Sequence, residues 1–103
     1  MEQLFDQIDG LIGTAARDLD EIERTLTDGY AHALSLEAEQ WRIERRIQEV
    51  AQGIQRGDTA EKARELTTLA EKLDGNAVDL TELRSRLTSL RRHADDVRVG
   101  SPR

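Results

Sequence analysis

The sequence contains no cysteine, so it can form neither a disulfide framework nor a metal site built on thiolates. It has a single proline, Pro102, and only three aromatic residues, Phe5, Tyr30 and Trp41. So few aromatic residues make a thick globular core hard to fill, whereas a thin core between helices needs mainly leucine, isoleucine and alanine. No apolar run approaches the ~20 residues of a membrane-spanning helix, and no signal segment opens the chain. We therefore expect a cytoplasmic protein that does not associate with membranes.

Charged residues are abundant but unevenly distributed along the 103 residues of the chain. Residues 1–40 contain ten acidic and two basic residues, whereas residues 81–103 contain three acidic and six basic residues. The formal net charge of −6 argues against nonspecific binding to polyanions, so we do not expect nucleic acid as a partner. The acidic first part and the basic last part can instead attract each other within one chain.

Apolar residues in the first half of the chain repeat with alternating spacings of four and three residues. This heptad pattern is typical of a helix that packs one face against another helix. The pattern crosses Asp28-Gly29 without a change of phase, so we predict one continuous helix over residues 2–55. The positions of the pattern are Met1, Phe5, Ile8, Ile12, Ala15, Leu19, Ile22, Leu26, Gly29, Ala33, Leu36, Gln40, Ile43, Ile47, Val50 and Ile54.

The stretch Arg56-Gly57-Asp58 spells an adhesion motif, but its residues also fit a turn between two helices. Gly57 can end the first helix, because glycine readily adopts the backbone conformation that follows a helix. Asp58 and Glu61 have the spacing of a capping box, which begins a helix. The sequence therefore predicts a turn at residues 56–58.

A seven-residue repeat of leucines follows the turn and predicts a second helix over residues 59–97, with a tail at 99–103. The stripe shifts just after Asp74-Gly75-Asn76, which predicts a local kink there. The repeat consists of Leu66, Leu73, Leu80 and Leu87, accompanied by Ala63, Ala70 and Ala77 and later by Leu83, Leu90 and Val97.

These patterns predict an all-α fold, a long antiparallel helical hairpin of the coiled-coil type with its turn near Gly57, in one domain over residues 1–98. The alternative is a compact three- or four-helix bundle that breaks at Asp28-Gly29, and Gly75 is a further candidate break. In the hairpin, Gln40 lies level with Asp74 and beside Asn76. Such a polar layer disfavours slipped pairings, so we predict that these three residues set the register.

Residues 1–14 extend beyond the second helix in this register and have no helical partner, although they are strongly apolar. An apolar helical overhang is typical of a contact surface. A second apolar stripe lies beside the heptad pattern in the middle of the first helix. We expect a homo-oligomer, a dimer or higher. The candidate interface residues are Leu4, Phe5, Ile8, Leu11, Ile12, Tyr30, Leu34 and Trp41.

Motifs that carry chemistry are missing. The histidines His32 and His93 lack the His-Glu-x-x-His and Glu-x-x-His spacings of metal sites, and no glycine-rich phosphate loop or nucleophile motif occurs. We therefore predict no catalytic, cofactor or metal site.

The sequence thus favours a non-enzymatic scaffold or adaptor that self-associates through the N-terminal overhang. One alternative is a helical chaperone or secretion partner that binds a client helix of another protein. A second alternative is an RNA-contacting arm. It would use basic residues near the turn, namely Arg42, Arg45, Arg46, Arg56, Lys62 and Arg64.

Overall fold

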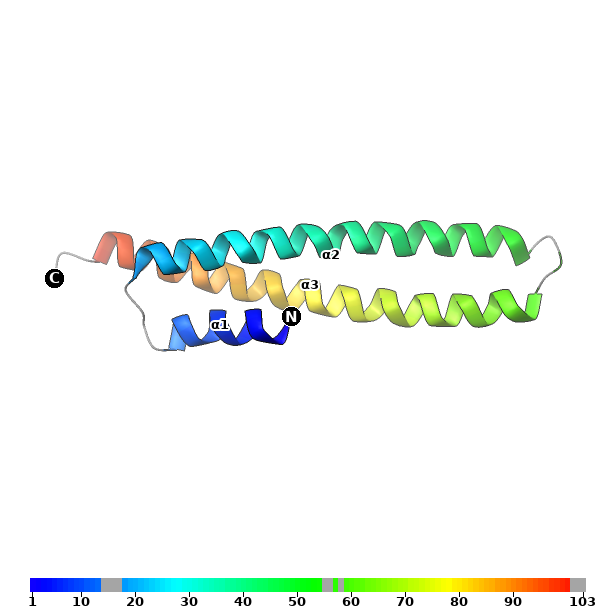
Figure 1. Cartoon of the computed structure of the whole chain (residues 1–103), viewed down its shortest axis with the longest axis horizontal. Helices are drawn as coiled ribbons and strands as arrows, with labels where there is room; N and C mark the ends of the chain where they lie inside the picture. Colours follow the sequence, from blue (N-terminus) through cyan, green and yellow to red (C-terminus); the bar gives the residue numbers. More distant parts are fainter. Residues whose placement is uncertain (14–17, 55–56, 58, 101–103) are drawn as a thin grey trace. The chain divides into compact units, whose positions relative to one another are not determined.

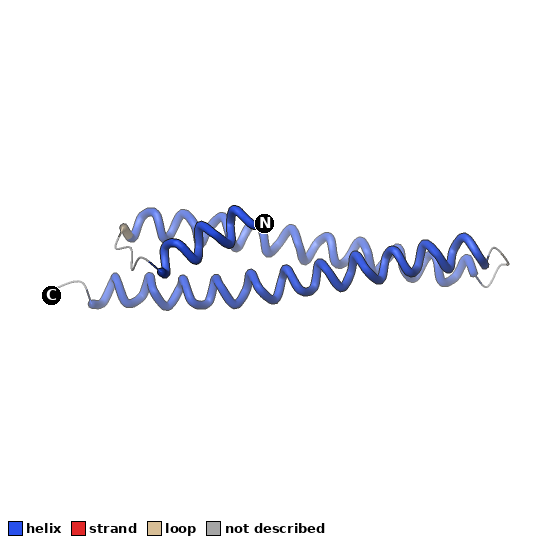
Figure 2. The backbone as a smooth tube through the Cα atoms, turned by 90° about the horizontal axis from the view of Figure 1, so that it is seen from below, coloured by secondary structure: helices blue, strands red, loops and turns tan. Residues whose placement is uncertain are grey.

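The computed structural model describes residues 1–13, 18–54, 57 and 59–100. They form three α-helices, α1 (Glu2–Gly13), α2 (Leu19–Ile54) and α3 (Thr59–Gly100), and contain no strand (Figure 1). Helices α2 and α3 pack closely and run in opposite directions (Figures 1 and 2). The chain is therefore an all-α helical hairpin, as the sequence predicts.

Gly57 lies at the turn of the hairpin and adopts a φ of 111°, in the left-handed region that glycine tolerates best. Its backbone N–H donates a hydrogen bond of 3.1 Å to the carbonyl oxygen of Ile54, which closes the end of α2. Gly57 thus acts as a helix stop. The predicted cap at Asp58, and Arg56 of the adhesion motif, lie outside the described residues.

The prediction of one continuous helix over residues 2–55 is wrong, because α1 ends at Gly13 and α2 begins at Leu19. Asp18 caps the start of α2. Its Oδ1 accepts a hydrogen bond of 3.3 Å from the backbone N–H of Glu21. Asp18 and Glu21 have the same capping-box spacing as Asp58 and Glu61.

The other two candidate breaks are not breaks. Asp28-Gly29 lies inside α2 and Gly75 lies inside α3, so the bundle alternative with a break at Asp28-Gly29 is also wrong. Helix α3 continues to Gly100, and the predicted tail therefore does not begin at Val99. Residues 101–103 lie outside the described residues.

The chain divides into two compact units, Met1–Leu34 with Thr81–Arg103 (unit 1) and Ser35–Leu80 (unit 2). In unit 1, α1 lies beside the first part of α2 and the last part of α3 (Figures 1 and 2). Gly29 allows a close approach here, because a Cβ atom at this position would overlap the side chain of Leu87. The apolar core of unit 1 consists of Ile8, Leu11, Ile22, Leu26, Ala33, Leu83, Leu87, Leu90 and Ala94.

The core of unit 2 lies between one stretch of α2 and one of α3. Ile43 and Val50 of α2 are buried together with Leu69 of α3. Three half-buried side chains, Ile47, Leu66 and Leu73, pack against this cluster.

The predicted stripe of α3 needs one correction. Leu69 and Asn76 occupy the buried positions assigned to Ala70 and Ala77, whereas Ala70 is exposed. Leu69, Asn76, Leu83 and Leu90 recur every seventh residue, so the stripe keeps its phase and does not shift after Asn76. Leucine buries more apolar area than alanine, which favours the helix rotation that places Leu69 in the core.

Candidate protein-binding surfaces

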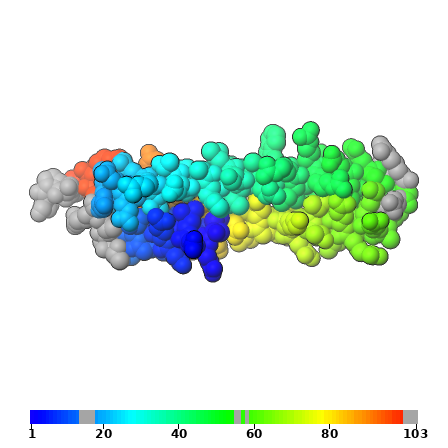
Figure 3. Space-filling view, viewed as in Figure 1, coloured from blue at the N-terminus to red at the C-terminus, as the bar shows by residue number. Residues whose placement is uncertain are grey.

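The N-terminal helix is covered by the chain itself. Ile8 on α1 is 0% exposed and Leu11 is also buried, so the prediction of an unpartnered overhang over residues 1–14 is wrong. Figure 3 shows the atoms of α1 packed directly against the first part of α2. Burying such side chains contributes about 1.5–3 kcal/mol each, which explains why an apolar α1 folds back. The other apolar candidates on α1, Leu4, Phe5 and Ile12, are half-buried.

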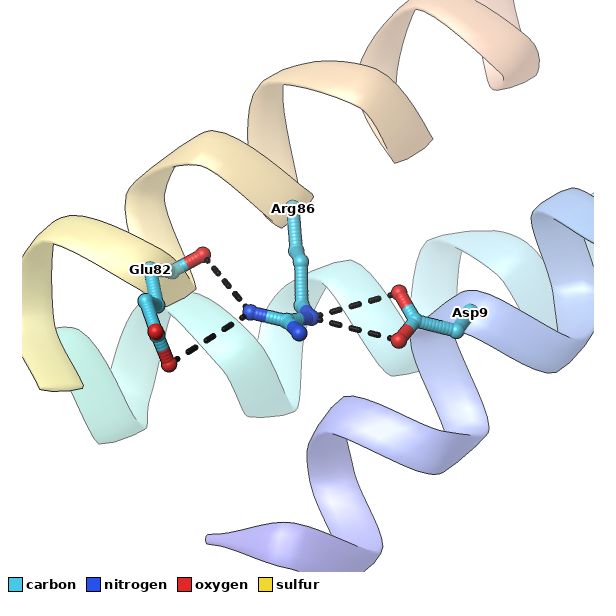
Figure 4. Close-up of polar contacts among 3 residues, drawn as sticks. All are labelled: Asp9, Glu82 and Arg86. Atoms are coloured by element: carbon cyan, nitrogen blue, oxygen red, sulfur yellow. Dashed lines mark hydrogen bonds and ion pairs between the residues drawn. The ribbon is translucent and has the colours of Figure 1, made fainter.

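Arg86 of α3 holds α1 through two contacts, of which Figure 4 shows the one to Asp9. Its Nε donates hydrogen bonds of 3.2 and 3.3 Å to the carboxylate of Asp9, and its guanidinium carbon lies 4.0 Å from the centroid of the Phe5 ring. Glu82, one turn earlier on α3, lies 3.8 Å from the other side of the guanidinium. A cation between a carboxylate and an aromatic face is well placed to fix the docked position of α1.

A polar contact also joins α1 to α2. The side-chain amide of Gln7 donates a hydrogen bond of 3.0 Å to the hydroxyl oxygen of Thr25, which is fully buried. This bond satisfies a polar group that would otherwise be costly to bury. This bond links α1 to α2, whereas Arg86 links α1 to α3.

Unit 1 also contains an open groove of about 240 Å³ between α2 and α3. Its apolar residues are Leu26, Tyr30 and Ala94, and its charged residues are Glu23, Arg91 and Arg98, with Thr27 beside them. Arg98 forms an ion pair with Glu23, and Arg91 donates a hydrogen bond of 3.4 Å to the phenol oxygen of Tyr30. The bond to Tyr30 raises the pKa of Arg91 above its ordinary value. The predicted attraction between the acidic first part and the basic last part of the chain is thus seen in unit 1.

Two predicted interface residues of unit 1 are exposed on α2. They are Tyr30 and Leu34. In contrast to Ile8 and Leu11, they are available to a partner while α1 stays docked.

The most exposed predicted interface residue belongs to unit 2. Trp41 on α2 is 78% exposed, and it lines a hollow of about 250 Å³ with Ala38, Arg42 and Arg45. Nη2 of Arg42 donates a hydrogen bond of 2.7 Å to Glu39, so its charge is paired along the helix. The hollow is therefore lined by the exposed indole ring of Trp41, by Arg42, which is paired with Glu39, and by Arg45.

The basic residues that an RNA-contacting arm would use are partly engaged with carboxylates. Arg46 of α2 lies 2.8 Å from Glu65 of α3 and 3.7 Å from Glu49. The hydrogen bond between Arg46 and Glu65 raises the pKa of the arginine and lowers the pKa of the carboxyl. These ion pairs compete with phosphate for the same charges.

The three residues predicted to set the register differ in burial. Asn76 is 8% exposed and its Oδ1 has no hydrogen-bond partner among the described residues. Gln40 is half-buried, and Asp74 is exposed. Of the three predicted residues, Asn76 is therefore the buried one, while Asp74 faces solvent.

The described residues contain no group of three or more histidine, aspartate or glutamate side chains that could hold a metal ion. Likewise, no helix in the described part of the chain is long and apolar enough to cross a membrane. No protein-family model, curated protein or solved structure matches the chain.

Proposed function

We propose that the protein is a non-enzymatic helical scaffold or adaptor that self-associates, and that Trp41 on α2 carries the contact. The supporting observation is the 78% exposure of the only tryptophan in a chain that has few aromatic residues. Tryptophan and arginine are enriched among the residues that dominate binding energy at protein interfaces. A cytoplasmic setting agrees with the absence of cysteine.

The position of the contact differs from the one that the sequence favours. Ile8 and Leu11 are buried against α2 and α3, so α1 offers a second copy less apolar surface than an overhang would. Trp41 remains uncovered by the described part of its own chain. We therefore assign assembly to the outer surface of α2 in unit 2.

The test is the mass of the full chain by light scattering over a range of concentrations. We expect wild type to show a dimer or larger species, and Trp41→Ala to shift it toward the monomer. Helical content should be retained, because alanine favours helix. Val78→Ala is the matched control, since Val78 is 56% exposed in the same unit and should leave the mass unchanged. A wild-type protein that is monomeric at every concentration would refute the proposal.

The open groove of unit 1 favours a second candidate, a chaperone or adaptor that binds a client helix. Its apolar residues Leu26 and Ala94 lie between charged side chains, an arrangement that suits an amphipathic helix. A partner that binds one-to-one, loses affinity with Tyr30→Ala and keeps it with Trp41→Ala would support this function. The opposite pattern would support self-association instead.

A further inference from the structure

The hollow at Trp41 has the outline of a hole in knobs-into-holes packing. Such a hole consists of four residues of one helix, at positions i, i+3, i+4 and i+7, and receives one side chain of a facing helix. The hollow of about 250 Å³ is lined by four residues with this spacing, namely Ala38, Trp41, Arg42 and Arg45. In such packing, a side chain of a facing helix would fill the hole.

We propose that two copies of the chain pair antiparallel along α2, so that Trp41 of each copy enters the hole of the other. This inference rests on the proposed self-association and adds its geometry. The pairing is isologous, because the same surface supplies both the knob and the hole.

The chemistry of the hole suits an indole ring. The small side chain of Ala38 leaves room for it, and the guanidinium of Arg45 can lie over its face in a cation–π contact, for which tryptophan is the best partner. Arg45 makes no ion pair with the described residues, in contrast to Arg42 and Arg46. Each dimer would contain two such contacts, one at each Trp41.

The distribution of charge selects the antiparallel direction. Residues 35–40 carry two acidic residues and no basic ones, whereas residues 41–46 carry three basic residues and one acidic. With Trp41 near the twofold axis, an antiparallel pair places the basic stretch of one copy along the acidic stretch of the other. A parallel pair would place the basic stretches, and Arg45 with Arg45, against each other. Opposite charges across an interface fix its register and orientation.

The absence of cysteine makes disulfide trapping a direct test, because introduced cysteines are the only ones present. In the antiparallel pair, position 38 of one copy lies level with position 45 of the other, while two copies of position 38 lie roughly 10 Å apart along the helices. A disulfide needs Cα atoms about 4.4–6.8 Å apart. Full-length Ala38→Cys and Arg45→Cys chains are mixed in equal amounts, oxidised, and separated by mass.

We expect the mixed 38–45 disulfide to exceed both homodimeric disulfides. A mixture of Ala38→Cys with Val78→Cys is the control and should give no such excess. An excess of 38–38 and 45–45 disulfides would overturn the antiparallel geometry and leave self-association standing. A dimer by light scattering with no excess of any disulfide would show that this surface is not the contact. A monomer at every concentration would instead refute the proposed function itself.

A second measurement tests the role of Arg45. Arg45→Gln is expected to weaken the dissociation constant of the dimer about 5- to 30-fold, because two cation–π contacts are lost. Arg64→Gln, on exposed α3 surface of the same unit, controls for the loss of one positive charge. Equal effects of the two variants would refute a specific contact at Arg45.

Discussion

Asp9 on α1 accepts a hydrogen bond of 3.2 Å from Nε of Arg86 on α3, although 77 positions separate the two residues in the sequence. The same guanidinium lies over the ring of Phe5. One arginine thus contacts α1 at two residues that are four positions apart on one side of the helix. This contact keeps the N-terminal helix docked in unit 1.

Replacing Arg86 should therefore loosen α1. Arg86→Ala removes the ion pair and the cation–π contact, which together stabilise the docked helix by about 1 kcal/mol. We expect hydrogen exchange of the α1 amides to accelerate about fivefold, with little change in α3. Glu82→Gln is the control, since it keeps both contacts of Arg86 with α1. Unchanged exchange in Arg86→Ala would show that apolar burial alone holds α1.

Ile8 should act as a core residue of unit 1. Because its side chain is fully buried, Ile8→Ala is expected to lower the free energy of unfolding by about 2–4 kcal/mol. Chemical denaturation measures the loss, and Ile12→Ala, at a half-buried position of the same helix, should cost less. The mass of the protein should stay unchanged. A smaller assembly by light scattering, without a lower free energy of unfolding, would mean that α1 contacts a partner instead.

Two glycines inside helices should respond in opposite ways to alanine. Gly75→Ala meets open space and should stabilise the protein by about 0.5–1 kcal/mol through helix propensity. Gly29→Ala must displace the side chain of Leu87, which is only 2% exposed, so overpacking of about 1–3 kcal/mol should exceed that gain. Thermal unfolding of both variants checks the contrast. Stabilisation by both would contradict the close contact at Gly29.

Asn76 should lower the stability of unit 2 while it disfavours slipped pairings of α2 and α3. Its buried Oδ1 lacks a partner, so Asn76→Leu is expected to stabilise unit 2 by about 1–3 kcal/mol. The same change removes the polar group that disfavours slipped pairings, so NMR spectra should show additional conformers. Asp74→Asn, at an exposed position, should alter neither property. A destabilised and uniform Asn76→Leu protein would show that the amide is satisfied and needed.

The ion pair between Arg46 and Glu65 should give a small pH-dependent stability. Its hydrogen bond lowers the pKa of Glu65 in the folded chain, so the contribution is present above the ordinary glutamate pKa of about 4.3. The contribution is lost as the pH falls through the folded-state pKa. Glu65→Gln should therefore lower Tm at pH 7, and its Tm should converge with that of wild type in acid. A Tm difference that does not depend on pH would exclude this charge effect.

The sequence predicts much of the hairpin because its strongest patterns agree with the packing. From Ile22 to Ile54 the spacing of four and three residues places apolar side chains toward α3, and α2 runs through Asp28-Gly29 as the unbroken phase predicts. Gly57 marks the turn because its φ is one that other residues avoid.

The break between α1 and α2 escapes the same pattern. Apolar residues of α1 happen to continue the phase of α2, although α1 packs as a separate helix. Asp18 and Glu21 carry the missed information, since their capping-box spacing marks a helix start. The phase alone cannot distinguish a continuous helix from one that folds back onto the same core.

The misassigned stripe on α3 has a different cause. Two series recur every seventh residue beside the leucines of the repeat. One consists of the alanines at 63, 70 and 77, and the other of Leu69, Asn76 and Leu83. Choosing between them requires weighing the larger area of Leu69 against the cost of burying Asn76, and that balance depends on the packing of α2.

For the interface candidates, the sequence could not tell that Ile8 and Leu11 are buried within the chain while Trp41 stays exposed.

The exposed position of Trp41 also determines which events the tryptophan fluorescence of this protein can report. Because Trp41 is the single tryptophan and is 78% exposed, its fluorescence should change little when α1 detaches or the core of unit 1 melts. Emission should shift to shorter wavelength when another molecule covers α2 at that point. The fluorescence of Trp41 should therefore report association and respond little to unfolding of the core of unit 1.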